Sequence, residues 1–355
     1  MINSHYVPQF ILRNFYSNDK ITYCDLEKKK VELRNTRSVF SEDGYYPEGI
    51  EKDLCKKAEY LFANLYHNKL ESARNNITLT LDDMFVIKKY LIVCAIRYKR
   101  ELTETDKQII RELGPSFQVD YDRSLNEILA CEKSDDLFEK LNSVPNKLID
   151  YLCGNGTPKM DDNIFLWAEM KDILSSYLIF VKTRGDEKFI IPDIGRAICE
   201  GPIAYKKVDY IMDIAFKTLN SQLIEISKYT SARDYTYYPL SRNLAVISIN
   251  AFYKLFTDSG LKMNIGLPPE CPTLSKALGF GDRNAIKPPK VKGSGKQKEF
   301  NYEIKYLTMQ DVCHFNSLVF TEAKRYVAFG ELSDIQNSIE YAKDYTQRDL
   351  TFLRV

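Results

Sequence analysis

The sequence predicts an α+β protein that is mainly α-helical and carries one small antiparallel sheet. Apolar residues recur at three- and four-residue steps over most of the chain, which is the spacing of amphipathic helices. Only a few short segments show the pattern of strands. Of the 355 residues, 28% are charged and 44% are hydrophobic. This balance is typical of a folded protein and excludes a disordered or collagen-like chain.

Long helices are predicted where the apolar spacing is sustained and a start signal precedes it. Thr80 and Thr308 are the expected N-caps, because an aspartate follows each of them three residues later and can close a capping box. Gly330 is the expected end of the last helix. The predicted helices cover residues 48–70, 80–98, 166–181 and 308–330.

Three segments are expected to form the small sheet. Ile21–Arg34 has the pattern of a hairpin, with two strands separated by Leu26–Lys29. Lys188–Ile191 and Leu244–Asn250 are strand candidates, the second because it is rich in β-branched residues. We expect one compact domain over residues 1–330, with a soft break near residues 154–158, and a helical extension over residues 331–355.

The expected location is the cytoplasm, without a membrane anchor or a disulfide framework. Residues 1–13 lack the basic and apolar regions of a secretory signal, and the longest apolar stretches are too short to span a bilayer. The eight cysteines are scattered, with no CxxC pair. The 50 basic and 49 acidic residues leave a net charge of +1. This overall charge does not predict a protein that binds nucleic acid over a large part of its surface. The oligomeric state stays open.

The chain opens with the motif His5-Tyr6-Val7-Pro8-Gln9-Phe10, followed by Leu12-Arg13-Asn14-Phe15. This motif resembles the signature of one family, the domain of unknown function 4238 of bacteria and fungi. Weaker similarities follow in chain order to about Phe329, although Arg242 replaces a proline of the family's pattern. The resemblance implies a fold family but no established activity. The residues that resemble family positions include Glu51, Glu59, Arg97, Asp193 and Asn316.

Three polar residues in apolar surroundings are the candidate catalytic residues: His5, Asp193 and Asn316. His5 precedes a short helix, where burial could tune an imidazole to act as a general base, although it could equally cap the local turn. Asp193 ends a predicted strand, a position that suits a catalytic acid or a plain turn residue. Asn316 lies on the apolar face of a predicted helix, so its amide needs hydrogen-bond partners. The favoured role is structural, with the amide joining a strand or loop backbone to the helix. We expect the three residues to meet.

Basic residues supply the candidate substrate contacts. Arg13 and Arg97 could clamp a phosphate, although the nearby glutamates favour an ion pair for Arg97. A segment with paired prolines and a Gly-Ser-Gly sequence is predicted to be a loop that could attract a polyanion or simply be solvated. Its lysines are Lys287, Lys290, Lys292, Lys296 and Lys298.

Two functions fit these residues. The first is a hydrolase of nuclease type that cleaves RNA or DNA in a bacterial, antiviral or toxin-like defence system. The second is a non-catalytic sensor or interaction protein whose buried polar residues are structural. The cofactor stays open: Mg²⁺ is compatible with Asp193 together with Glu303 and Lys305, but no metal site is assigned. Standard nucleotide-binding, zinc-protease and serine-hydrolase motifs are absent.

Overall fold

A computed structural model describes residues 3–99, 120–143, 164–201, 232–249 and 289–353. Its largest sheet has seven strands in the order β11-β12-β6-β10-β9-β8, and β5 also pairs with β12. All pairs are antiparallel except β12 with β6, which run parallel. The strands are β5 (Asn76–Thr80), β6 (Tyr177–Thr183), β8 (Ala197–Gly201), β9 (Ala232–Pro239), β10 (Leu244–Ile249), β11 (Lys290–Lys292) and β12 (Glu299–Leu307).

Two smaller sheets complete the strand framework. The first has four strands in the order β3-β2-β13-β7 and joins the N-terminal hairpin to a strand near the C-terminus. The second pairs β1 with β4, and His5 lies opposite Ser41. Their bounds are β1 (Asn3–His5), β2 (Ile21–Asp25), β3 (Lys30–Arg34), β4 (Ser41–Asp43), β7 (Ile191–Pro192) and β13 (Tyr326–Phe329).

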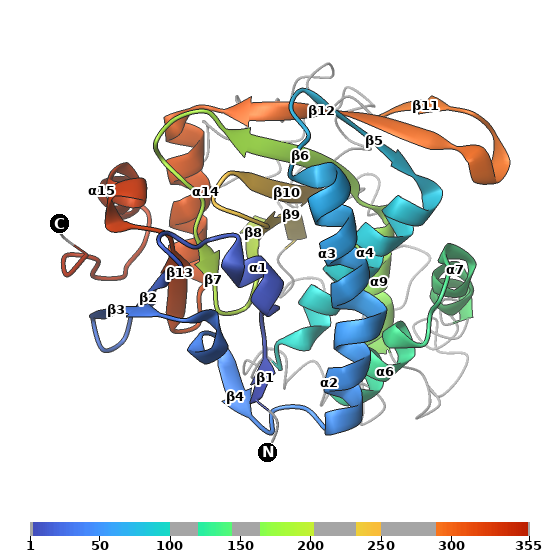
Figure 1. Cartoon of the computed structure of the whole chain (residues 1–355), viewed down its shortest axis with the longest axis horizontal. Coiled ribbons are helices and arrows are strands. Elements are labelled where there is room, and N and C mark those ends of the chain that lie inside the picture. The colour runs from blue at the N-terminus through green and yellow to red at the C-terminus, as the bar shows by residue number, and fades with distance from the viewer. Residues whose placement is uncertain (1–2, 100–119, 144–163, 202–231, 250–288, 354–355) are drawn as a thin grey trace, which may run out of the picture.

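The described helices lie beside these sheets (Figure 1). Thr80 and Thr308 cap α4 and α14 as predicted, each in a reciprocal capping box with its aspartate. The predicted helix over residues 48–70 is continuous but includes two π-helical turns, at Cys55–Glu59 and Tyr66–Leu70. The bounds are α1 (Gln9–Arg13), α2 (Glu48–Leu54), α3 (Tyr60–Leu65), α4 (Leu81–Arg97), α6 (Tyr121–Leu129), α7 (Ser134–Ser143), α9 (Ile164–Ser175), α14 (Met309–Glu322) and α15 (Gln336–Ala342).

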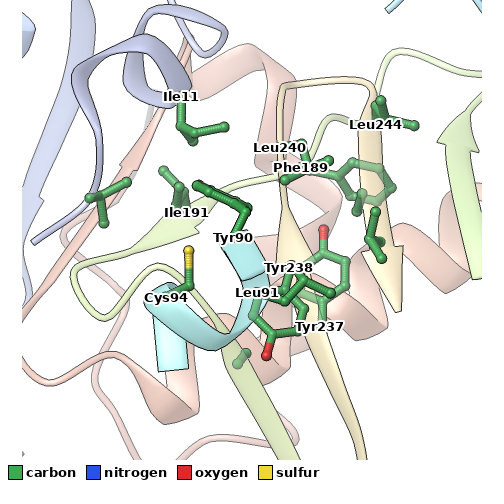
Figure 2. Packing of buried hydrophobic residues seen from close by; sticks show 14 of the residues in the cluster. Ile11, Tyr90, Leu91, Cys94, Phe189, Ile191, Tyr237, Tyr238, Leu240 and Leu244 are labelled. Carbon is green, nitrogen blue, oxygen red and sulfur yellow. The ribbon is translucent and has the colours of Figure 1, made fainter. Parts of the chain in front are cut away.

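One apolar core joins the helices to the strands. Figure 2 shows side chains of α1, α4 and β9 in the same interior, among them Ile11, Tyr90 and Tyr237. The rings of Phe62 and Tyr90 stack with their centroids 3.8 Å apart, which fixes α3 against α4. The helix α4 is buried over most of its circumference, and its buried residues continue to its C-terminal residue, Arg97.

The prediction of a mainly helical protein with one small antiparallel sheet is wrong. The chain is an α+β protein with a seven-stranded mixed sheet and two further sheets. The hairpin Ile21–Arg34 is confirmed, but Ile191 joins its sheet while Leu244–Ile249 belongs to the larger one. The predicted domain bounds stay a prediction, and the break at residues 154–158 lies outside the described residues.

Two predicted helices extend too far because of apolar runs that suit either structure. Residues 177–181 were expected to continue a helix but belong to β6, whose central residues are buried between two neighbouring strands. A run that is apolar on all sides carries no periodicity that separates a strand from a helix. The last helix ends at Glu322 instead of Gly330, and Tyr326–Phe329 forms β13.

Candidate functional site

His5 is held in the interior by the short sheet at the N-terminus. Its side chain is 5% exposed, and Nε2 lies 3.3 Å from the carbonyl oxygen of Thr36. A carbonyl only accepts hydrogen bonds, so we assign the ring proton to Nε2 and the lone pair to Nδ1. Burial lowers the pKa of His5, although the Thr36 carbonyl opposes the shift. The imidazole is therefore a neutral base at pH 7.

Arg97, the last residue of α4, lies in the interior near His5. The guanidinium is 1% exposed and forms a close ion pair with Glu59 and a second one of 3.8 Å with Glu51. Burial alone would lower the pKa of Arg97, but Glu59 and Tyr46 beside it hold that pKa above its usual value. The predicted ion pairing of Arg97 with these glutamates is confirmed.

The π-helical turn at Cys55–Glu59 explains how both glutamates reach one arginine. Eight residues of regular α-helix rotate a side chain by roughly 80° beyond two full turns, which would place Glu51 and Glu59 on different faces. A π turn accommodates one additional residue, which reduces this offset to roughly 20°. The sequence alone gives no sign of this turn. We name His5, Glu51, Glu59 and Arg97 the Arg97 cluster.

Two buried polar atoms of the Arg97 cluster have no hydrogen-bond partner in the part of the chain that the structure describes. These atoms are Nε of Arg97 and Oε2 of Glu51. The side chains of Glu51 and Glu59 are 20% and 17% exposed, so solvent reaches the cluster from the carboxylate side. An unpaired buried polar atom costs about 1–3 kcal/mol, and such atoms therefore mark a place for a ligand or water.

Glu51 differs from an ordinary surface carboxylate. Burial raises its pKa, while Arg97, the backbone N–H of His5 and the hydroxyl of Ser4 act in the opposite direction. The neighbouring Glu59 raises it further. The cluster thus places a base with a lowered pKa beside an acid with a raised pKa, the combination that general acid–base catalysis requires.

Asp193 has structural contacts with the loop after α14. One carboxylate oxygen accepts from the backbone N–H of Lys324 at 2.9 Å, and the other accepts from Arg325 and Tyr326 at 2.9 and 3.0 Å. Burial raises the pKa of Asp193 against these three hydrogen bonds. By binding successive N–H groups, Asp193 orders the turn between α14 and β13.

Asn316 is fully buried and uses both ends of its amide. Its oxygen accepts from the backbone N–H of Ile190 at 3.2 Å, and its nitrogen donates to the Lys188 carbonyl at 2.7 Å and to the Ser338 hydroxyl at 2.8 Å. These contacts match the structural tie favoured for Asn316. In the described part of the chain, no hydrogen bond joins His5, Asp193 and Asn316 to one another, and their meeting in one site stays a prediction.

The predicted substrate-binding residues are dispersed. Arg13 is exposed and donates to Gln9 within α1. The lysine segment was expected to be a loop, but from Lys290 onward it is an exposed β11–β12 hairpin, because β12 is stabilised by pairing with β5 and β6. Figure 1 shows this hairpin at the upper right and β1, which carries His5, at the bottom. Lys287 lies outside the described residues.

No metal centre is evident among the described residues. Neither Asp193 nor Glu303 belongs to a group of three or more His, Cys, Asp or Glu side chains that could bind an ion there. Within the same described ranges, no helix is both long and apolar enough to cross a bilayer.

Comparison with known families decides the relationship of this chain to other proteins. The model of the family described as "Protein of unknown function (DUF4238)" matches residues 3–332. The chain belongs to this family. No match to the chain was found among curated proteins or solved structures. The family match includes every member of the Arg97 cluster but assigns it no chemistry.

Sequence reasoning identified His5 and Arg97 but missed other contributors to their surroundings. Tyr46 donates from its hydroxyl to the Arg97 carbonyl, and its ring lies 5.9 Å from the guanidinium. Arg196 pairs with Glu169 at 3.4 Å and donates to the Ala95 carbonyl on the last turn of α4. The Tyr-Tyr-Pro sequence before α2 was the available signal for Tyr46, since an aromatic before a helix start commonly packs onto it.

Proposed function

We propose that the protein is a phosphodiester-cleaving enzyme of nuclease type and that the Arg97 cluster is its active site. The observation that carries the proposal is the pair of unpartnered buried atoms, Arg97 Nε and Glu51 Oε2, beside the neutral imidazole of His5. A donor fixed on a buried guanidinium suits a phosphate oxygen. A base and a protonated acid supply the two proton transfers of cleavage.

RNA is the substrate that this chemistry favours, because its ribose carries an internal nucleophile. Nδ1 of His5 would remove the proton of the 2′-hydroxyl, and the 2′-oxygen would attack phosphorus. The bond from phosphorus to the 5′-oxygen would break, and protonated Glu51 would donate its proton to that leaving oxygen. Arg97 would stabilise the charge on the non-bridging oxygens. The products are a 2′,3′-cyclic phosphate and a free 5′-hydroxyl.

The charge balance of the cluster supports this assignment of roles. One arginine and two ionised glutamates would give a net charge of −1, which repels a phosphate. The raised pKa of Glu51 favours its protonated form relative to an ordinary glutamate, and with Glu51 protonated the cluster would be neutral. Glu59 would be a positioning residue, since its close ion pair holds Arg97 in place. Activity of this kind would suit a role in bacterial antiviral defence or a toxin-like system.

A non-catalytic sensor or interaction protein is the second candidate. The observation in its favour is that Asp193 and Asn316 are saturated by backbone and hydroxyl partners, as structural residues would be. In that case the ion pairs of the Arg97 cluster would also have only a structural role, and the protein would turn over no substrate.

Incubation of the purified protein with tRNA, single-stranded RNA and plasmid DNA, with Mg²⁺ or with EDTA, separates the two candidates. The variants are His5→Ala and His67→Ala, the second being a control on an exposed histidine. We expect RNA cleavage by the wild type and by His67→Ala, and a loss of at least about 100-fold in folded His5→Ala. Absence of cleavage of all three substrates, or equal RNA cleavage by His5→Ala, would refute the proposed enzyme. Cleavage of plasmid DNA alone would refute the ribose mechanism.

A further inference from the structure

The residues that directly follow His5 and Arg97 in the sequence are both tyrosines. Tyr6 and Tyr98 are half-buried, while His5 and Arg97 before them are buried in the Arg97 cluster. A third half-buried tyrosine, Tyr45, follows β4, the strand that pairs with β1. We name Tyr6, Tyr45 and Tyr98 the tyrosine surface.

The ring of Tyr6 contacts the rings of both Tyr45 and Tyr98. The centroids of Tyr6 and Tyr45 are 4.9 Å apart at an interplanar angle of 58°, and those of Tyr6 and Tyr98 are 5.8 Å apart at 84°. Neither pair is stacked face to face. Each of the two pairs therefore meets at an angle, and the Lys99 ammonium also lies 5.2 Å from the centroid of the Tyr45 ring. Tyr6 itself is only half-buried, so part of its side chain is accessible to a further planar group.

Polar contacts hold the tyrosine surface in a fixed position. The Tyr6 hydroxyl donates to Glu42 at 3.2 Å, and the Tyr45 hydroxyl accepts from the backbone N–H of Lys99 at 2.6 Å. The Lys99 ammonium donates to the Tyr45 carbonyl at 3.0 Å and pairs with Asp122 at 2.9 Å. A ligand that stacks on rings held in this way loses little free energy to their ordering.

We propose that the tyrosine surface binds an unpaired base of single-stranded RNA next to the nucleotide that is cleaved at the Arg97 cluster. This inference rests on the proposed function. Every base has a π-face, and stacking on tyrosine requires that the base is not already paired in a duplex. Because Tyr6 directly follows His5 and Tyr98 directly follows Arg97, the tyrosine surface lies beside the Arg97 cluster. The substrate class is therefore single-stranded RNA.

The test is the binding of a fluorescein-labelled single-stranded RNA octamer, measured by fluorescence anisotropy in the inactive His5→Ala background. Tyr6→Leu removes the aromatic ring, and Tyr6→Phe retains it. Tyr60→Leu is the control, because Tyr60 on α3 is 63% exposed and does not belong to the tyrosine surface. We expect Tyr6→Leu to weaken RNA binding roughly 10-fold. Tyr6→Phe and Tyr60→Leu should bind the RNA about as tightly as the His5→Ala protein without a further substitution. Thermal unfolding of each variant confirms that it is folded.

The outcomes separate this inference from the proposed function. If Tyr6→Leu and Tyr60→Leu bind equally well, or if a duplex of the same sequence binds as tightly as the single strand, the tyrosine surface is not a base-binding site. RNA cleavage by the wild type would still support the active site in that case. If the octamer binds through Tyr6 but no RNA is cleaved, the base-binding surface stands and the enzyme is refuted.

Discussion

The guanidinium of Arg97 and the carboxylate of Glu59 form a close ion pair in the interior, although 38 residues separate them in the chain. Arg97 ends α4, and Glu59 ends the π-helical turn that precedes α3. Stacking of Phe62 on Tyr90 brings these two helices together. The apolar contact between the helices thus positions the charges, and the charges in turn define the Arg97 cluster.

Substitution of Glu59 should destabilise the protein, because it leaves the Arg97 charge buried without its nearest partner. We expect Glu59→Gln to lower the free energy of unfolding by about 3 kcal/mol. Glu71→Gln is the matched control, since Glu71 follows the same helical segment but pairs with His67 at the exposed surface. Urea denaturation measures both, and equal stability of the two variants would show that Arg97 does not depend on Glu59.

Asn316→Ala should be the most destabilising change on α14 that removes no apolar contact. It leaves the N–H of Ile190 and the carbonyl of Lys188 without their amide partner, at about 1–3 kcal/mol for each buried group. Gln310→Ala, on an exposed position of the same helix, is expected to change stability by less than about 0.5 kcal/mol. Thermal unfolding compares the two variants, and an Asn316→Ala protein as stable as the wild type would contradict the structural role of Asn316.

Lys88 should make stability rise with pH above neutrality. Its ammonium is buried and donates to the Ile173 carbonyl and to the Ser176 carbonyl and hydroxyl at the end of α9. Burial lowers the pKa of Lys88 to about 7, against an ordinary value near 10.5. Between these values the unfolded chain binds more protons, so unfolding becomes less favourable as pH rises, by up to about 1.4 kcal/mol per pH unit.

The measurement is the free energy of unfolding at pH 7.0 to 8.5 in the wild type and in Lys88→Met. Burial also lowers the pKa of Lys89, so Lys88→Met should reduce the slope without abolishing it. Both proteins contain the same cysteines, so subtracting one curve from the other removes the contribution of the cysteines to the pH dependence of unfolding. Parallel curves for the two proteins would show that Lys88 keeps its ordinary pKa.

The lysines of the β11–β12 hairpin are expected to act only on long polyanions. In Figure 1 the hairpin lies at the upper right and β1, which carries His5, at the bottom, so the hairpin is not part of the Arg97 cluster and is expected to contact only a longer substrate. We expect Lys290→Gln with Lys292→Gln to leave cleavage of an RNA octamer unchanged and to weaken binding of tRNA, with a smaller salt dependence. Slower octamer cleavage by this variant would place the hairpin in the active site.

Local signals in the sequence predicted the features that depend on a few neighbouring residues. The capping boxes of Thr80 and Thr308 and the strands of the Ile21–Arg34 hairpin are confirmed, because capping and turn chemistry act over three to five residues. The family resemblance is also confirmed by the match over residues 3–332.

Features that depend on distant partners were not predictable in the same way. The strand β12 was interpreted as part of a lysine-rich loop, and its stability comes from β5 and β6, which lie more than 100 residues earlier. The partners of Asp193 and Asn316 are backbone groups, which carry no residue-specific signal. The π-helical turn that aligns Glu51 with Glu59 has no signature in the apolar spacing.

In the proposed mechanism, His5 and Glu51 cleave RNA through its own 2′-hydroxyl. The most direct measurement compares an RNA octamer with the same octamer carrying 2′-O-methyl groups, followed by mass spectrometry of the products. We expect fragments ending in a 2′,3′-cyclic phosphate from the first substrate and no cleavage of the second, and no cleavage of either octamer by His5→Ala. Cleavage of the 2′-O-methyl octamer at a similar rate, or no cleavage of either, would contradict it.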